Sequence, residues 1–273
     1  LSQKSLLPNL CVRPSFQVLD ILEYACGLKL GPALTLSQNP IFEMDSKLTQ
    51  IVMKIKSVPT RGRTLDHAAL VYDFFEPILM LGKQAEYDRH IVSLLELRKT
   101  DRVLDLGCGT GVLTRMIADK LDAKAGGVSL GIDAAAKMIR VARKKREGET
   151  CRFEVAAAED LPFENASFDA AVSSLFFHHV PLDLKEQSLS EAYRVLRPQG
   201  RLVIADMHIP TTWMGALVSH VSRWFFLQPE IGENIRGVLP SIIEKSGFDP
   251  PKLVRTYFGY IALFISQKAE RAK

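Results

Sequence analysis

The sequence predicts an α/β protein with a doubly wound, mostly parallel sheet of seven strands. From residue 102 onward, short apolar runs alternate with segments of helical periodicity, which is the pattern of βαβ units. Such units form a parallel sheet covered by helices on both faces. Only Gly259 separates the last two apolar runs, so we expect them to form an antiparallel hairpin at the end of the sheet.

The predicted elements follow one another in a regular order. Helices at Leu65–Phe75 and Gln84–Leu97 precede the sheet. Strands are expected at Arg102–Leu106, Val128–Asp133, Arg152–Ala157, Phe168–Ser174, Arg201–Asp206, Leu253–Phe258 and Tyr260–Ser266. The later helices are expected at Val112–Leu121, Ala134–Arg146, Leu184–Leu196, Thr212–Leu227 and Glu233–Ser246.

The first part of the chain has a different composition, with scattered Pro and Gly and weak periodicity. Helical patterns occur at Phe16–Cys26 and Phe42–Lys56, and the basic, breaker-rich stretch Lys54–Arg63 is typical of a linker. We therefore predict an N-terminal helical extension or cap over residues 1–63 and a main domain over residues 64–273.

Composition narrows the function classes. A net charge of +4 over 273 residues is too small to indicate nucleic-acid binding. The four cysteines, Cys11, Cys26, Cys108 and Cys151, stand far apart, so neither a metal site nor a disulfide framework is expected. No run reaches the ~18 apolar residues of a membrane span. We expect a cytoplasmic protein, and leave open peripheral contact with a membrane and a homodimer.

A glycine-rich loop gives the clearest functional signal. The segment VLDLGCGTGVL, Val103–Leu113, combines a buried strand, a turn with Gly107, Gly109 and Gly111, and the start of a helix. Glycine lets a ligand approach the backbone, and a helix start offers free N–H groups. The spacing is GxGxG and not the GxGxxG of dinucleotide-binding proteins. Asp105 would repel a pyrophosphate, so a zwitterionic amino-acid cofactor suits the loop better.

Asp133 provides the second part of the expected cofactor site. It ends the second predicted strand, twenty-two residues after Gly111. A carboxylate at this place in a doubly wound fold can accept hydrogen bonds from both hydroxyls of a ribose. This feature alone would serve a nicotinamide cofactor as well.

Four segments in this order resemble the class I S-adenosylmethionine-dependent methyltransferases: VLDLGCGTG, GIDAAAKMI, AEDLPFENASFDAAVSSLFFHHV and EAYRVLRPQGRLVIAD. Within this class, the sequence resembles the ubiquinone/menaquinone biosynthesis C-methyltransferases. The resemblance implies a Rossmann-like fold from about Leu65 to the C-terminus. It also implies that Asp105, Gly107 and Gly109 line the methionine moiety of S-adenosylmethionine. Asp133 would then bind the ribose, and Met138 would pack near the adenine.

One segment departs from the family pattern. Relatives carry an Asp in a GDA triplet that meets the adenine amino group, whereas Ala156, Ala157 and Ala158 stand here. Glu159 and Asp160 are the substitutes, together with the backbone of Ala158. The full set of predicted cofactor-binding residues is Asp105, Gly107, Cys108, Gly109, Gly111, Asp133, Ala134, Met138, Ala158, Glu159, Asp160, Ser173 and Ser174.

The methyl acceptor should bind beyond the carboxyl ends of the strands. His178 and His179 follow the fourth predicted strand there, and either could act as a base or orient the acceptor. Tyr72 lies in a YD segment that resembles one in the quinone methyltransferases, where the Tyr approaches the cofactor. These three are the candidate catalytic residues.

Aromatic and apolar residues near the expected lids favour a small lipophilic or aromatic acceptor. They are Phe74, Phe75, Trp213, Met214, Trp224, Phe225 and Phe226. Quinone-like C-methylation is therefore the leading hypothesis, with phospholipid or other small-molecule N- or O-methylation as the alternative. Two other classes stay open, a nicotinamide-dependent oxidoreductase and a non-catalytic scaffold that keeps the fold.

Overall fold

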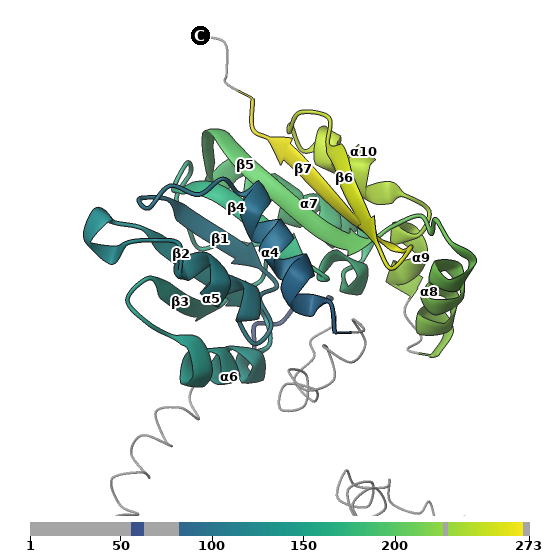
Figure 1. The fold of residues 1–273 in the computed structure, drawn as a ribbon, viewed down its shortest axis with the longest axis horizontal. Helices are drawn as coiled ribbons and strands as arrows, with labels where there is room; N and C mark the ends of the chain where they lie inside the picture. Colours follow the sequence, from purple (N-terminus) through teal and green to yellow (C-terminus); the bar gives the residue numbers. More distant parts are fainter. Residues whose placement is uncertain (1–55, 63–81, 226–228, 270–273) are drawn as a thin grey trace, which may run out of the picture. The chain divides into compact units, whose positions relative to one another are not determined.

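The computed structural model describes residues 56–62, 82–225 and 229–269 (Figure 1). The helices predicted at Phe16–Cys26 and Leu65–Phe75 lie outside these residues, as does Phe42–Lys56 apart from its last residue. The division of the chain at residue 63 therefore stays a prediction.

A seven-stranded sheet forms the centre of the described structure. Its strands are β1 (Arg102–Leu106), β2 (Val128–Asp133), β3 (Cys151–Val155), β4 (Phe168–Ser174), β5 (Leu196–Met207), β6 (Lys252–Tyr257) and β7 (Ile261–Gln267). They lie in the order β3-β2-β1-β4-β5-β7-β6. The first five strands are parallel, and β7 pairs antiparallel with both β5 and β6. The predicted fold class and its terminal hairpin are confirmed.

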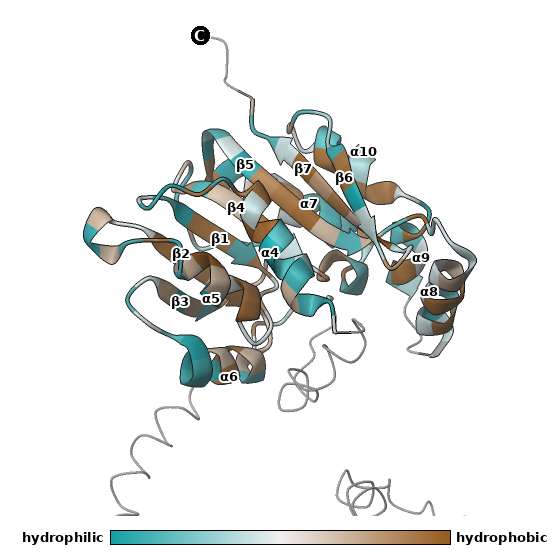
Figure 2. Cartoon of the chain, viewed as in Figure 1, coloured by the Kyte–Doolittle hydropathy of each residue, from teal (hydrophilic) through white to brown (hydrophobic). Residues whose placement is uncertain are grey.

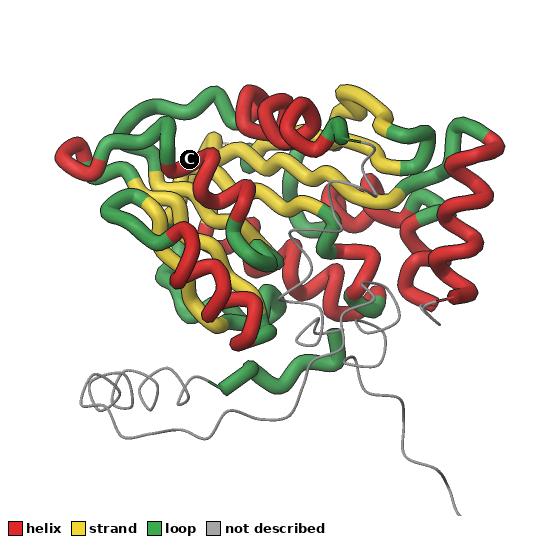
Figure 3. Tube along the Cα trace, turned by 60° about the horizontal axis from the view of Figure 1, so that its bottom comes forward, coloured by secondary structure: helices red, strands yellow, loops and turns green. Residues whose placement is uncertain are grey.

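Helices cover both faces of this sheet (Figure 3). Along β1, Val103 packs in a core with residues of α4 and α5, whereas Leu104 and Leu106 pack in a core with α7 and α10. This alternation is the two-residue period of a strand buried on both sides. The helices of the first face are α4 (Gln84–Leu94), α5 (Val112–Ala118) and α6 (Ala136–Arg146), and those of the second are α7 (Leu182–Val195) and α10 (Val238–Lys245).

The short 3-10 helix η1 (Ala123–Ala125) precedes β2, and the other three helices lie at the carboxyl edge of the sheet. The short 3-10 helix η2 (Phe177–His179) follows β4, and α8 (Trp213–Phe225) and α9 (Pro229–Asn234) follow β5. Figure 1 shows α8 and α9 side by side, and α9 also packs against η2. No helix within the described ranges is long and apolar enough to cross a membrane.

Most predicted bounds differ from the observed ones by up to three residues, and two larger differences have identifiable reasons. Strand β5 begins at Leu196 and not at Arg201, because Leu196 is fully buried and pairs with Phe168 ahead of a bulge. The single helix predicted at Glu233–Ser246 is two helices, α9 and α10. Gly237 stands between them with a φ of 83°, a left-handed conformation that interrupts a helix.

The strand order predicts where a ligand binds. Strand order runs outward from β1 on one side and from β4 on the other, so the carboxyl ends of β1 and β4 flank the point where the topology switches. In open α/β sheets the ligand crevice lies at this point.

Candidate active site

The glycine loop after β1 requires its glycines. Gly107 has a φ of 71°, and a Cβ built on it would stand 2.3 Å from the Phe176 ring. Gly111 has a φ of 85°, and its Cβ would stand 2.4 Å from the Phe153 ring. Gly111 directly precedes α5 and does not line the pocket. The loop therefore depends on Gly107 and Gly111 for close packing as well as for backbone conformation.

Asp105 lies at the base of the loop, with 1% of its surface exposed. The Thr114 hydroxyl donates a hydrogen bond of 2.6 Å to its Oδ2. Burial above all, together with the charges of Asp133 and Asp88, raises the pKa of the Asp105 carboxyl to about 7. The site thus holds a carboxylate that a nearby cation would stabilise.

Asp133 ends β2 and fixes the other side of the loop. Its Oδ2 accepts a hydrogen bond of 3.1 Å from the Gly109 N–H, and its Oδ1 accepts one of 2.8 Å from the Ala135 N–H. The carboxylate is therefore held in one orientation at the edge of the pocket.

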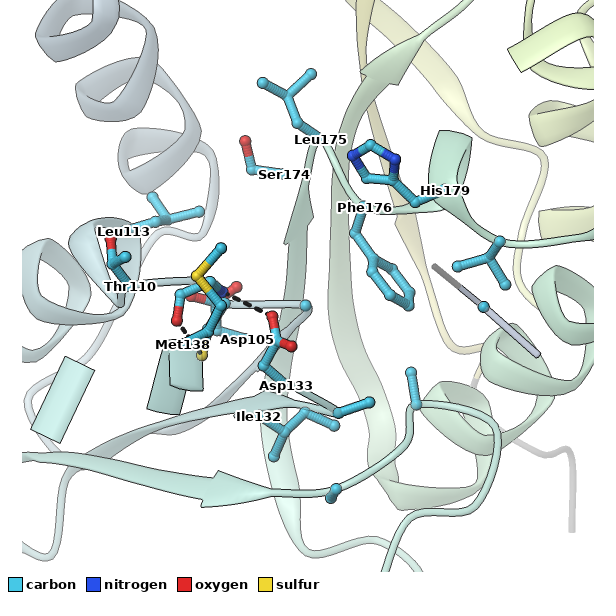
Figure 4. Close-up of a pocket in the computed structure, with 18 of the residues that line it drawn as sticks. Asp105, Thr110, Leu113, Ile132, Asp133, Met138, Ser174, Leu175, Phe176 and His179 are labelled. Atoms are coloured by element: carbon cyan, nitrogen blue, oxygen red, sulfur yellow. Dashed lines mark hydrogen bonds between the residues drawn. The ribbon is translucent and has the colours of Figure 1, made fainter. Parts of the chain in front are cut away.

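A pocket opens at these strand ends (Figure 4). The picture shows Asp105, Asp133 and Met138 on one side and Phe176 and His179 on the other. The predicted site residues that line it are Asp105, Gly107, Cys108, Gly109, Asp133, Ala134, Met138, Ala158, Glu159, Ser174 and His179.

Besides Gly111, three predicted residues in the described part of the chain lie outside the pocket lining. The Ser173 hydroxyl is buried and donates a hydrogen bond of 3.0 Å to the carbonyl of Leu106. His178 Nδ1 lies 2.8 Å from Oδ1 of Asp206. Asp160 is exposed. Tyr72 falls outside the described residues.

Asp206, at the end of β5, holds η2 in place. Its fully buried carboxylate accepts hydrogen bonds from the Phe177 N–H at 2.6 Å and from Asn234 Nδ2 at 3.3 Å, besides its contact with His178. The His178 and His179 rings lie 3.9 Å apart between centroids. His178 thus connects the buried carboxylate to His179, which faces the pocket.

Sequence reasoning missed Asp88 and Gln84 on α4, which also line the pocket. Asp88 is only 2% exposed, and Gln84 Nε2 donates to both of its oxygens at 3.1 Å. Burial raises the pKa of the Asp88 carboxyl to about 6. The signal was present, because Asp88 shares the buried face of this helix with Tyr87 and Ile91. The Tyr87 hydroxyl in turn lies 2.9 Å from the hydroxyl of Ser174.

The predicted linker also contributes to the pocket. The Val58 N–H donates to the Ala134 carbonyl at 3.1 Å, and the Thr60 hydroxyl donates to Oε1 of Glu159. Thr60 and Gly62 line the pocket beside these contacts. No periodicity marks such an irregular segment, so this role has no signal in the sequence.

The charged residues in the described lining of the pocket are acidic. Asp88, Asp105, Asp133 and Glu159 line it, whereas no lysine or arginine does so among the described residues. Burial disfavours the charged form of a carboxylate, and it raises the pKa of both Asp88 and Asp105. The ligand that best suits this lining brings a positive charge, as a sulfonium or an ammonium does, and a pyrophosphate does not suit it.

Comparison with known proteins agrees with this geometry. A family model described as a methyltransferase domain matches residues 104–204. A ubiquinone/menaquinone biosynthesis C-methyltransferase of Geotalea daltonii is 31% identical over 193 residues, which are 68% of this chain and 76% of that protein. A protein of the same name from Hahella chejuensis is 30% identical and covers 76% of this chain and 91% of its own length.

A solved structure resembles the fold. Haemonchus contortus phosphoethanolamine N-methyltransferase 2, in complex with phosphomonomethylethanolamine and S-adenosylhomocysteine, matches with a TM-score of 0.57. The identity is 18%, over 77% of this chain and 59% of that chain. At this identity the likeness concerns the fold alone.

Proposed function

We propose that this chain, which belongs to the class I S-adenosylmethionine-dependent methyltransferases, methylates a carbon atom of a small, lipophilic, quinone-like acceptor. The methyltransferase activity and the cofactor follow from the family. The observation that supports the acceptor class is the likeness, at 31% identity, to a ubiquinone/menaquinone biosynthesis C-methyltransferase. A nicotinamide-dependent oxidoreductase and a non-catalytic scaffold are accordingly not supported.

The residues of the pocket fit S-adenosylmethionine. The described lining residues include four carboxylates and no lysine or arginine. This lining matches a donor that carries a sulfonium and an ammonium. We assign the methionine moiety to the glycine loop and Asp105, and the ribose to Asp133. Met138 and Ala158 would enclose the adenine, with Glu159 as an acceptor for its amino group.

The donor supplies a methyl group already activated by the sulfonium, so the protein mainly orients the acceptor and excludes water. Orientation alone can account for ~7–11 kcal/mol of the barrier in well-positioned systems. Leu175 and Phe176 give the acceptor side an apolar wall. His179 faces the same pocket, and in this proposal it is the general base that accepts the proton released by a phenol or a ring carbon on methylation.

Asp206 and His178 act through His179. The Asp206 carboxylate contacts η2 at two points, the backbone N–H of Phe177 and the ring of His178. The His178 ring in turn lies against His179. Both are positioning residues in this proposal, because neither lines the pocket.

The test uses methyl-labelled S-adenosylmethionine and two acceptors. One is a naphthoquinol with a free ring C–H and an isoprenoid tail, and the other is phosphatidylethanolamine, which represents N-methylation. We expect label on the ring carbon of the quinol, identified by mass and fragmentation. Label on the phospholipid nitrogen alone would contradict the acceptor class. The cytoplasmic location expected from the sequence stays a prediction, and a homodimer stays open.

A further inference from the structure

Helix α8 turns small side chains inward and large apolar side chains outward. Gly215 and Ser219 are buried, whereas the side chains of Trp213 and Trp224 are 76% and 78% exposed. Surface helices of globular proteins show the opposite arrangement, with the apolar stripe on the core. The exposed apolar side chains of α8 therefore call for an explanation.

These side chains form one continuous face. Trp213, Leu217, Val221 and Trp224 follow at intervals of four, four and three residues, which places them on one side of a helix. The α8 apolar face is defined here as Trp213, Met214, Leu217, Val218, Val221 and Trp224, all of them exposed. In the part of the chain that the structure describes, the other exposed large apolar side chains are Leu182, Ile209 and Leu253. Figure 2 shows hydrophobic colouring along α8.

The orientation of α8 is fixed by its contact with the β6–β7 turn. A Cβ on Gly215 would stand 2.4 Å from the carbonyl oxygen of Gly259, so only glycine permits this contact. The same carbonyl accepts a hydrogen bond of 2.8 Å from the Thr211 N–H. The Thr212 hydroxyl accepts one of 3.0 Å from the Gly215 N–H at the helix start. Rotation of the apolar face toward the sheet would break this contact.

The charge that α8 itself carries has one sign. Helix α8 contains no Asp or Glu, and its exposed polar residues include His220 and Arg223. The Arg223 guanidinium lies beside Gly232 of α9, the neighbouring helix that carries Glu230 and Glu233. The chain as a whole carries a net charge of +4. Helices that lie in a membrane interface combine apolar and tryptophan side chains with flanking basic residues, which attract anionic lipid. Trp213 and Trp224 stand at the two ends of the face, ~16 Å apart along the axis, and tryptophan is enriched at membrane interfaces.

The position of α8 relates the face to the pocket. Helix α8 follows the carboxyl end of β5, on the edge where the pocket opens. Helix α9 packs against both α8 and η2, whose His179 lines the pocket. Helix α8 is thus linked through α9 to the side of the pocket that the proposed function assigns to the acceptor. Its strip of one helix, ~20 Å long, is small for a dimer interface, which buries ~800 Å² on each partner.

We propose that the α8 apolar face docks on the surface of a lipid bilayer that contains anionic lipid. Docking would let the protein take a lipophilic acceptor from that bilayer, and this role rests on the proposed function. The docking itself does not, because it can be measured without any acceptor.

The chain carries its own probe for this contact. Its two tryptophans, Trp213 and Trp224, both lie on the α8 apolar face. Vesicles of phosphatidylcholine and phosphatidylglycerol are added to the full chain. The expected result is a shift of tryptophan emission to shorter wavelength, with quenching by brominated lipid and flotation of the protein with the vesicles. Pure phosphatidylcholine should bind more weakly.

A pair of variants tests which residues act. Leu217→Gln with Val221→Gln keeps both tryptophans and should weaken vesicle binding at least tenfold. Leu253→Gln is the matched control, because Leu253 is equally exposed on β6 and should leave binding unchanged. Binding of S-adenosylhomocysteine by each variant checks that the fold is retained.

Three results would overturn the proposal. The first is an emission that vesicles do not change. The second is an emission already at short wavelength and protected from acrylamide without vesicles, since another part of the chain would then cover the face. The third is a shift that depends on protein concentration alone, which would assign the face to a second copy. Vesicle binding without quinol methylation would instead contradict only the acceptor class.

Discussion

Two regions of the carboxyl edge differ in what they present to a ligand. The pocket at the ends of β1 and β2 is lined by four carboxylates, each of which accepts at least one hydrogen bond. Helix α8, beyond the end of β5, presents apolar side chains and no carboxylate. In our proposal the first region recognises the donor by charge, and the second serves a lipophilic acceptor. The following changes should separate these two properties.

Gly107→Ala should have the largest effect. The new Cβ meets the Phe176 ring at 2.3 Å, and the φ of 71° strains any L side chain. We expect donor binding and activity to fall more than a hundredfold, measured by calorimetry and by methyl transfer. Gly109→Ala is the control, because its φ is also positive but nothing lies within 4 Å of its Cβ. An equal loss in both variants would show that backbone conformation alone matters.

His179→Ala should change the acceptor step and leave the donor pocket intact. Loss of a general base typically lowers the rate by ~10²–10⁴, so kcat should fall while the affinity for S-adenosylmethionine stays within a factor of about two. An unchanged kcat would remove His179 from the mechanism and leave it as a packing residue of η2.

Asp88→Asn should weaken donor binding but stabilise the donor-free protein. Burial raises the pKa of Asp88 to about 6, so the folded chain binds more protons than the unfolded chain between about pH 4 and pH 6. The free energy of unfolding therefore falls as the pH rises through this window. The Asn side chain of the variant does not titrate, so the variant lacks this decrease in stability.

The measurement is the melting temperature at pH 8 without and with donor. We expect Asp88→Asn to melt higher than the wild type without donor, and to gain less from S-adenosylmethionine. Asp119→Asn, at an exposed position of a surface ion pair, should change either value little. A lower melting temperature for donor-free Asp88→Asn would contradict the unfavourable burial of this carboxylate.

The sequence predicted the parts that depend on local pattern. The apolar runs of β1, β2 and β4 are buried on both faces, and the glycine loop has the backbone conformations that its spacing implies. The parts that depend on tertiary contacts were missed. Thr60 reaches the pocket through irregular backbone, which leaves no periodic signal. The outward face of α8 depends on the contact of Gly215 with Gly259, forty-four residues away.

Recognition of the donor by charge is tested most directly by titrating S-adenosylmethionine and S-adenosylhomocysteine against the wild type over a range of pH. The two ligands differ in the sulfonium charge. Protonation of Asp88 and Asp105, whose pKa values are raised to about 6 and about 7, removes negative charge from the pocket as the pH falls. We expect S-adenosylmethionine to bind more tightly than S-adenosylhomocysteine at pH 8, and this preference to shrink below pH 6. A ratio of affinities that does not change with pH would contradict the account.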